Sequence, residues 1–93
     1  MVYSYIHSEG RVGVLIELNC ETSFVAKTQE FSQLAHELCL QIASMRPETI
    51  DALMEQVYVR DTSKKVSSLL AALIAKTGEN ITLRNFTRYE IGE

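Results

Sequence analysis

The sequence predicts an α+β domain in which helices cover one face of a three-stranded antiparallel sheet. Two segments near the N-terminus alternate apolar and polar residues with a period of two, and a short turn separates them. Two longer segments then repeat their apolar residues with the period of a helix, and a last alternating segment follows. We therefore expect one domain over residues 1–93, with two layers and the element order β-β-α-α-β.

The second alternating segment, residues 12–20, is the strand around which the domain is expected to form. Its even positions are all apolar and would face the core: Val12, Val14, Ile16, Leu18 and Cys20. Its odd positions would face the other way: Gly13, Leu15, Glu17 and Asn19. The β-type segment Val2–His7 precedes it. Between the two segments, Ser8, Glu9 and Gly10 predict a hairpin turn in which Gly10 takes a positive φ.

The first helix is expected to begin after Thr28, whose side chain can cap a helix N-terminus. Apolar residues then recur at alternating intervals of three and one, as one face of a helix requires: Phe31, Leu34, Ala35, Leu38, Cys39, Ile42 and Ala43. Pro47 disfavours the α region for Arg46, so this helix should end there.

Residues 48–60 admit two interpretations. Some of their apolar residues could form a short helix: Ile50, Leu53, Met54 and Val57. Val57–Val59 could instead be extended. A second long helix is predicted beyond them, capped by one of the polar residues Asp61, Thr62 and Ser63. Its apolar face would hold Val66, Leu69, Leu70, Leu73 and Ile74, and Gly78 would close it.

The last strand is predicted over residues 80–91. One of its faces would carry Ile81, Leu83, Tyr89 and Ile91. The other face would carry Thr82, Arg84, Phe86, Arg88 and Glu90. The sheet face without helices would then show Leu15, Glu17, Asn19, Arg84, Phe86 and Arg88. The two apolar residues in this set could be ordinary surface residues, or they could mark a contact between two sheets.

Composition and motifs argue against several classes of protein. A net charge of −3 with few clustered cations argues against a general nucleic-acid binder. No apolar run approaches the roughly 20 residues that a membrane helix needs, and the N-terminus does not resemble a secretory signal. Cys20 and Cys39 both fall on predicted core faces, which favours free buried thiols in a reducing compartment, cytoplasmic or organellar.

Signatures of catalysis are absent from the sequence. No phosphate-binding loop, no nucleophile-elbow pentapeptide and no zinc-protease motif occurs. His7 and His36 have no partners at the spacing of metal ligands. We therefore expect neither an enzyme, nor a metal, nor a cofactor.

Phe24 follows the central strand, within the short segment Glu21–Val25. Phe24 and Val25 could simply pack against the end of the hydrophobic layer, and the pattern alone favours this interpretation. A rigid strand that leads into a short loop is also a good way to present an aromatic residue to a partner.

Three blocks of the sequence, in order, resemble the elongation factor Ts family. RVGVLIELNCETSFVAKTQEF, which begins at Arg11, is similar to the family's GVLVE-x-NCETDFVA signature. LMEQVYVRD, from Leu53, resembles LLEQPFVKD. AKTGENI, from Ala75, and RYEIG, from Arg88, are similar to AKIGENI and RFELG. The blocks cover nearly the whole chain, so the resemblance is specific.

The resemblance implies an antiparallel fold of two strands, helices and one strand. It also implies a partner, the translational GTPase elongation factor Tu. In the family, the Asp-Phe tip of TDFV enters the GTPase and wedges between helices of its nucleotide-binding domain, so that GDP leaves. Carried over, Phe24 would be the wedge, and Thr22, Ser23, Val25 and Lys27 would flank it.

This sequence departs from the family pattern in several places. Ser23 stands where the family has Asp, and Val57 replaces the Pro of the EQP block. The family's N-terminal helical module, a helical insertion between Ile50 and Leu53, and the second half of the sheet are absent from it. The chain could be a complete short protein or one domain of a longer one.

Three hypotheses follow from these observations. The chain could bind elongation factor Tu and promote GDP release, or it could dock on the same GTPase without exchanging its nucleotide. It could also form a homodimer through the open sheet face, where Leu15, Glu17, Arg84 and Phe86 are the candidate residues. Direct binding to nucleic acid or to a membrane is not expected.

Overall fold

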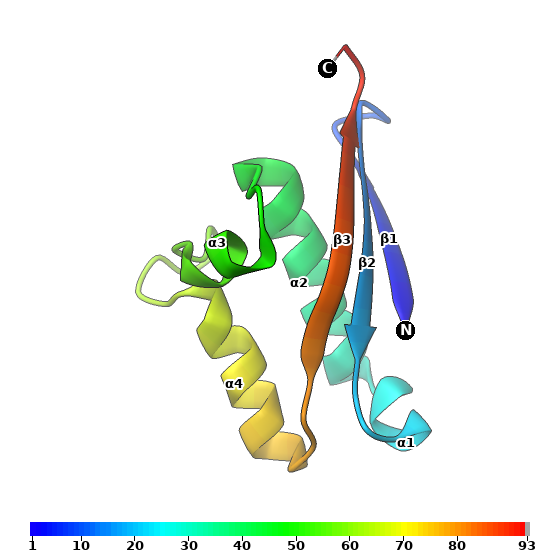
Figure 1. The fold of residues 1–93 in the computed structure, drawn as a ribbon, viewed down its shortest axis with the longest axis vertical. Helices are drawn as coiled ribbons and strands as arrows, with labels where there is room; N and C mark the ends of the chain where they lie inside the picture. Colours follow the sequence, from blue (N-terminus) through cyan, green and yellow to red (C-terminus); the bar gives the residue numbers. More distant parts are fainter. Residues whose placement is uncertain (93) are drawn as a thin grey trace.

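The protein has a two-layer α+β fold, seen in a computed structural model that describes residues 1–92 (Figure 1). Its three strands form one antiparallel sheet in the order β1-β2-β3: β1 (Val2–His7), β2 (Val12–Asn19) and β3 (Thr82–Glu90). Four helices lie between β2 and β3 in the chain: α1 (Ser23–Ala26), α2 (Gln29–Met45), α3 (Ile50–Glu55) and α4 (Val66–Thr77). The predicted class and the antiparallel sheet are confirmed, and the short α1 is additional to the helices expected. In residues 48–60, α3 confirms the interpretation as a short helix, but it ends at Glu55, and Val57 is paired in a bridge with Lys65.

The helices are gathered on one face of the sheet, and its other face is open (Figure 1). Helix α2 lies against β1 and β2, α4 lies beside α2, and α3 contacts α4 and β3. The short α1 lies beyond the end of β2, at the same end of the molecule as the last turn of α4. The fold thus leaves two features outside the core: the open sheet face and the tip that α1 forms.

The hairpin turn between β1 and β2 has the predicted residues. Ser8, Glu9 and Gly10 all have positive φ values, of 54°, 58° and 88°. Gly10 therefore occupies the left-handed position expected of it, and two non-glycine residues share that strained region. The amide of Arg11 then bonds to the carbonyl of His7 at 3.2 Å and closes the turn.

Helix α2 begins and ends where the sequence predicted. The Thr28 side chain accepts a hydrogen bond from the Phe31 amide at 3.3 Å, which caps the first turn. Arg46 follows the last helical residue in the left-handed conformation, with φ of 52°, and Pro47 comes next. The apolar face of the helix is buried against the sheet, with Phe31, Leu38 and Ile42 fully inaccessible.

The prediction for the start of the second long helix is wrong. Its N-cap is Lys65, which makes no side-chain cap hydrogen bond, rather than any of residues 61–63. An antiparallel bridge pairs Lys65 with Val57, and Lys65 has an extended backbone, so the helix begins only at Val66. Asp61 instead accepts hydrogen bonds from the amide and hydroxyl of Ser63 within the preceding loop. At the other end of α4, Gly78 closes the helix with a φ of 73°, as predicted.

The predicted faces of the last strand are wrong beyond Leu83, because β3 contains a bulge. The pairing of β2 with β3 shifts by one residue at this point: Leu18 pairs with Leu83, but Glu17 pairs with Asn85. The extra residue, Arg84, reverses the alternation for the rest of the strand. Phe86 therefore pairs with the buried Ile16 and packs against the core. Arg88 follows on the same face and donates to the Ala43 carbonyl of α2 at 3.0 Å.

Candidate partner-binding site

The candidate site is the tip formed by residues 21–27, at the end of β2. Residues 23–26 form one helical turn, α1. The hydroxyl of Thr22 caps this turn by accepting a hydrogen bond from the Val25 amide at 3.3 Å. The amide of Lys27 donates to the Ser23 carbonyl at 3.2 Å and ends it. The segment expected to be a short loop is therefore a capped helical turn.

The two apolar residues of the tip have opposite environments. The Phe24 side chain is 81% exposed, whereas Val25 is only 6% exposed and belongs to the core. Because adjacent positions on a helical turn point about 100° apart, burying one of them leaves the other in solvent. The packing interpretation is thus right for Val25 and wrong for Phe24. Thr22, Ser23 and Lys27 are also exposed.

The tip is tied to the turn between α4 and β3 by two glutamates, which the sequence analysis did not single out. The Glu79 carboxylate accepts from the amides of Glu21 and Thr22, at 3.1 and 3.0 Å, and from the Thr22 hydroxyl at 2.6 Å. In return, the Glu21 carboxylate accepts from the Asn80 amide. Two segments 57 to 59 residues apart in the chain are held together in this way.

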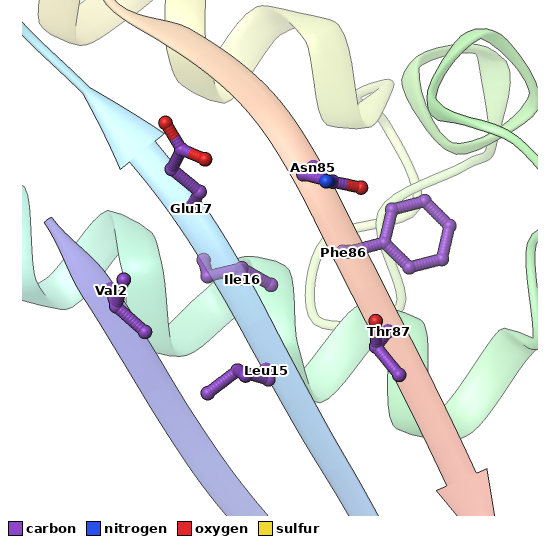
Figure 2. Close-up of a pocket in the computed structure, with 7 residues that line it drawn as sticks. All are labelled: Val2, Leu15, Ile16, Glu17, Asn85, Phe86 and Thr87. Carbon is purple, nitrogen blue, oxygen red and sulfur yellow. The ribbon is translucent and has the colours of Figure 1, made fainter.

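The open sheet face carries apolar side chains from all three strands. Strand partners point to the same side, so the register places residues on this face in three rows: Ile6–Gly13–Tyr89, Ser4–Leu15–Thr87 and Val2–Glu17–Asn85. Val2, Ile6, Leu15 and Tyr89 are each about half or more exposed. Figure 2 shows the shallow hollow around Leu15 and Glu17. Of the predicted residues on this face, Leu15 and Glu17 lie there, whereas Phe86 does not.

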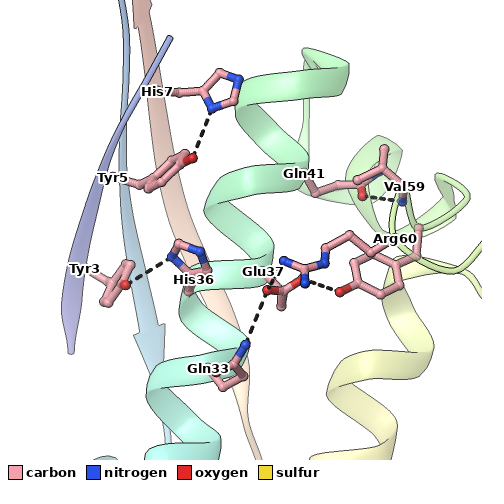
Figure 3. A network of polar contacts seen from close by, with 10 residues as sticks. Tyr3, Tyr5, His7, Gln33, His36, Glu37, Gln41, Val59 and Arg60 are labelled. Atoms are coloured by element: carbon pink, nitrogen blue, oxygen red, sulfur yellow. Dashed lines mark hydrogen bonds and ion pairs between the residues drawn. The ribbon is translucent and has the colours of Figure 1, made fainter. Parts of the chain in front are cut away.

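A second polar cluster joins α2 to the loop between α3 and α4 (Figure 3). The buried Glu37 accepts from the Tyr58 hydroxyl and pairs with Arg60 at 3.3 Å. Burial, and then the neighbouring Glu37 carboxylate, raise the pKa of Tyr58 to about 12. One turn along the helix, the fully buried Gln41 donates to the Val57 carbonyl and accepts from the Val59 amide, both at 3.0 Å.

The histidines and cysteines take structural positions. His36 lies beside Tyr3 and Tyr5 on the helix side of β1, and its Nδ1 is 3.3 Å from the Tyr3 hydroxyl (Figure 3). Both cysteines are free thiols, and burial raises the pKa of Cys39 to about 12. Within residues 1–92, no group of three or more potential metal ligands comes together, and no helix is long and apolar enough to cross a membrane.

Comparison with known proteins identifies the family. The family described as Elongation factor TS matches residues 21–93. Elongation factor Ts of Thermotoga neapolitana is 39% identical over an alignment that covers 100% of this chain and 69% of the relative. The corresponding proteins of Syntrophomonas wolfei and Moorella thermoacetica are 36% and 35% identical, with 64% and 68% of their lengths covered. The chain therefore belongs to the elongation factor Ts family.

The relatives have residues that this chain lacks within the matched region. Their alignments extend over 136 or 138 positions, whereas this chain contributes 93 residues. The tip and the turn that holds it both lie in the part that the family description matches.

Proposed function

We propose that this chain binds elongation factor Tu and promotes release of GDP, with Phe24 as the residue that enters the GTPase. The observation that carries the proposal is the exposure of Phe24 on a capped helical turn, beside a buried Val25. An exposed aromatic side chain on a defined backbone can fill a pocket of a partner with little loss of entropy, as interface hot spots do. In this function the chain is a binding protein of the cytoplasm or an organellar matrix, and it catalyses no covalent reaction.

The exchange itself follows from thermodynamic linkage. If the tip binds the nucleotide-free GTPase more tightly than the GDP-bound form, the affinity for GDP must fall by the same factor. A wedge that displaces helices near the phosphate-binding region would produce this difference. The chain needs no catalytic group of its own for such an effect.

The test is the release of a fluorescent GDP analogue from purified elongation factor Tu as this protein is titrated in. We expect the wild type to accelerate GDP release in a saturable way. At a fixed subsaturating concentration, Phe24→Ala should accelerate release about a hundredfold less, since truncation of a hot-spot residue costs on the order of 2–4 kcal/mol of binding free energy. Met45→Ala is the matched control, because Met45 is also an exposed apolar residue but ends α2. Equal activity of wild type and Phe24→Ala would contradict the proposal.

Ser23 distinguishes an exchange factor from a docking protein. It occupies the first position of α1, where a carboxylate would also interact favourably with the helix N-terminus. If the acidic contact of the family limits this chain, Ser23→Asp should accelerate release of GDP. A complex on a sizing column without acceleration by either form would support docking without exchange.

A second candidate function is self-association through the open sheet face. Val2, Ile6, Leu15 and Tyr89 form an apolar surface there, with no helix over it in residues 1–92. Two copies packed face to face would bury these side chains, as in a sandwich of two sheets. Sedimentation velocity tests this: we expect a dimer for the wild type and a monomer for Leu15→Glu, and a wild type that is monomeric at high concentration would contradict it.

A further inference from the structure

The hydrogen bonds of Glu79 connect the exposed tip to the turn between α4 and β3. Three donors converge on this one carboxylate, and all three come from the two residues just before α1. Both carboxylate oxygens are used, since Oε1 accepts from the two amides and Oε2 accepts from the Thr22 hydroxyl. Such convergence fixes the direction in which the chain enters the helical turn.

The turn that carries Glu79 is itself well anchored. Gly78 ends α4 in the left-handed conformation, and its amide donates to the Ile74 carbonyl at 2.8 Å. The Glu79 amide donates to the hydroxyl of Thr77 at 3.2 Å. Two residues after Glu79, the side chain of Ile81 is buried in the core. The carboxylate therefore projects from a base that both α4 and β3 hold in place.

The tip, by contrast, is a single helical turn that depends on the contacts at its two ends. A single helical turn is not stable in isolation, because nucleation of a helix is unfavourable. Within α1 only Val25 is buried, with the partly buried Ala26 packed beside it, so apolar contacts hold one side of the turn. The exit of the tip is held by Thr28, whose amide and hydroxyl both donate to the Val25 carbonyl, at 3.0 and 2.7 Å. The entry of the tip is held by Glu79.

We propose that Glu79 is a positioning residue that pre-organises the tip, so that Phe24 is already held in its binding orientation in the free protein. This inference rests on the proposed function. Without Glu79 the same contacts with the partner could still form, but the tip would have to be ordered on binding. The effect should therefore fall on the affinity for the GTPase and leave the rate of GDP release at saturation unchanged.

The experiment compares Glu79→Ala, Glu79→Gln and the wild type in the GDP-release assay, over the full titration. We expect Glu79→Ala to raise the half-saturating concentration about tenfold, as expected for lost pre-organisation, with the same plateau rate. Glu79→Gln keeps an oxygen that can accept from both amides, and should stay within about twofold of the wild type. Glu55→Ala is the control, because it also removes a carboxylate, one that is exposed at the end of α3 and paired with Lys65 rather than with the tip.

A second measurement uses the free protein and does not depend on the partner. We expect the amides of Glu21, Thr22 and Val25 to exchange with solvent faster in Glu79→Ala than in the wild type, while amides in the middle of α2 are unchanged. Unchanged exchange at these amides would overturn the positioning role, as would an unchanged half-saturating concentration. A Glu79→Gln variant as weak as Glu79→Ala would also overturn it, since the charge would then contact the partner directly. If the wild type itself failed to release GDP, the proposed function would fail, and the amide exchange would still decide whether Glu79 orders the tip.

Discussion

Glu37 and Glu79 each connect segments that are distant in the chain, but their surroundings differ. Glu37 lies on the inner part of α2, is buried, and joins the helix to the loop before α4 through Tyr58 and Arg60 (Figure 3). Glu79 lies in a surface turn, is half-buried, and joins that turn to the exposed tip. The first connection is surrounded by packed side chains, whereas the second has solvent on one side.

Because of this difference, we expect Glu37 to affect the stability of the whole domain and Glu79 to affect only the order of the tip. Buried polar groups that lose a hydrogen-bond partner cannot bond to water instead. Removing the hydrogen bonds that Glu37 and Gln41 make to the loop before α4 should therefore lower the free energy of unfolding of the whole domain. Groups released at the tip become hydrated, so breaking the contact at Glu79 should loosen α1 alone. The predictions below test that separation.

The largest effect on stability is expected for Gln41→Leu. Gln41 is fully buried, and its amide satisfies the Val57 carbonyl and the Val59 amide of the loop. Leucine is similar in size but leaves both backbone groups without this partner, which should cost about 2–4 kcal/mol of unfolding free energy. Urea denaturation followed by circular dichroism measures it.

Gln33→Leu is the control for this variant. Gln33 lies on the same helix but is exposed, and its amide donates to Glu37 at the longer distance of 3.4 Å. Its replacement should change the unfolding free energy by less than about 0.5 kcal/mol. A similar loss of unfolding free energy in the two variants would mean that the buried hydrogen bonds of Gln41 do not stabilise the domain.

The features of the fold that depend on local patterns could be predicted from the sequence, and those that depend on long-range pairing could not. The strands, the hairpin turn, the cap at Thr28 and the end of α4 at Gly78 depend on local patterns, and these predictions are confirmed. The bulge at Arg84 and the bridge between Val57 and Lys65 depend on how segments pair in space. No period within either segment indicates them, so the faces of β3 and the start of α4 were predicted wrongly.

The candidate site was predictable in part for the same reason. The pattern after the central strand drew attention to Phe24, but the pattern alone favoured burial of this residue, which the structure shows exposed. The contact from Glu79 to Thr22 joins residues 57 apart, so only the fold brings them together. The one sequence signal was the position of Glu79 inside the AKTGENI block, which resembles the family without indicating what the glutamate contacts.

An intermediate effect is expected for Tyr58→Phe, and it should depend on pH. Without the hydroxyl, the buried Glu37 carboxylate loses a donor, which should cost about 1–2 kcal/mol near pH 8. In the wild type, the pKa of Tyr58 is raised from 10.0 to about 12, so the tyrosine contributes stability that is complete below pH 10 and is lost as the pH rises from 10 to 12. The difference between the two proteins should therefore shrink over this interval.

Urea denaturation at several pH values between 8 and 11 measures this difference. Burial also raises the pKa of Cys39, from 9.0 to about 12, so both proteins should begin to lose stability above pH 9. Above pH 10 the wild type should lose about 1.4 kcal/mol per pH unit more than Tyr58→Phe. Parallel curves above pH 10 would show that the Tyr58 hydroxyl is not held in its neutral form.

A smaller effect on stability than for Gln41→Leu or Tyr58→Phe is expected for Glu79→Ala, the variant with a large expected effect on binding. Its carboxylate lies at the surface, and the groups that it releases can bond to water, so the unfolding free energy should fall by less than about 1 kcal/mol. Urea denaturation beside Gln41→Leu provides the comparison under identical conditions. A loss for Glu79→Ala as large as that for Gln41→Leu would mean that the tip and the core unfold as one unit. The tenfold change in half-saturating concentration would then reflect a destabilised domain rather than a loosened tip.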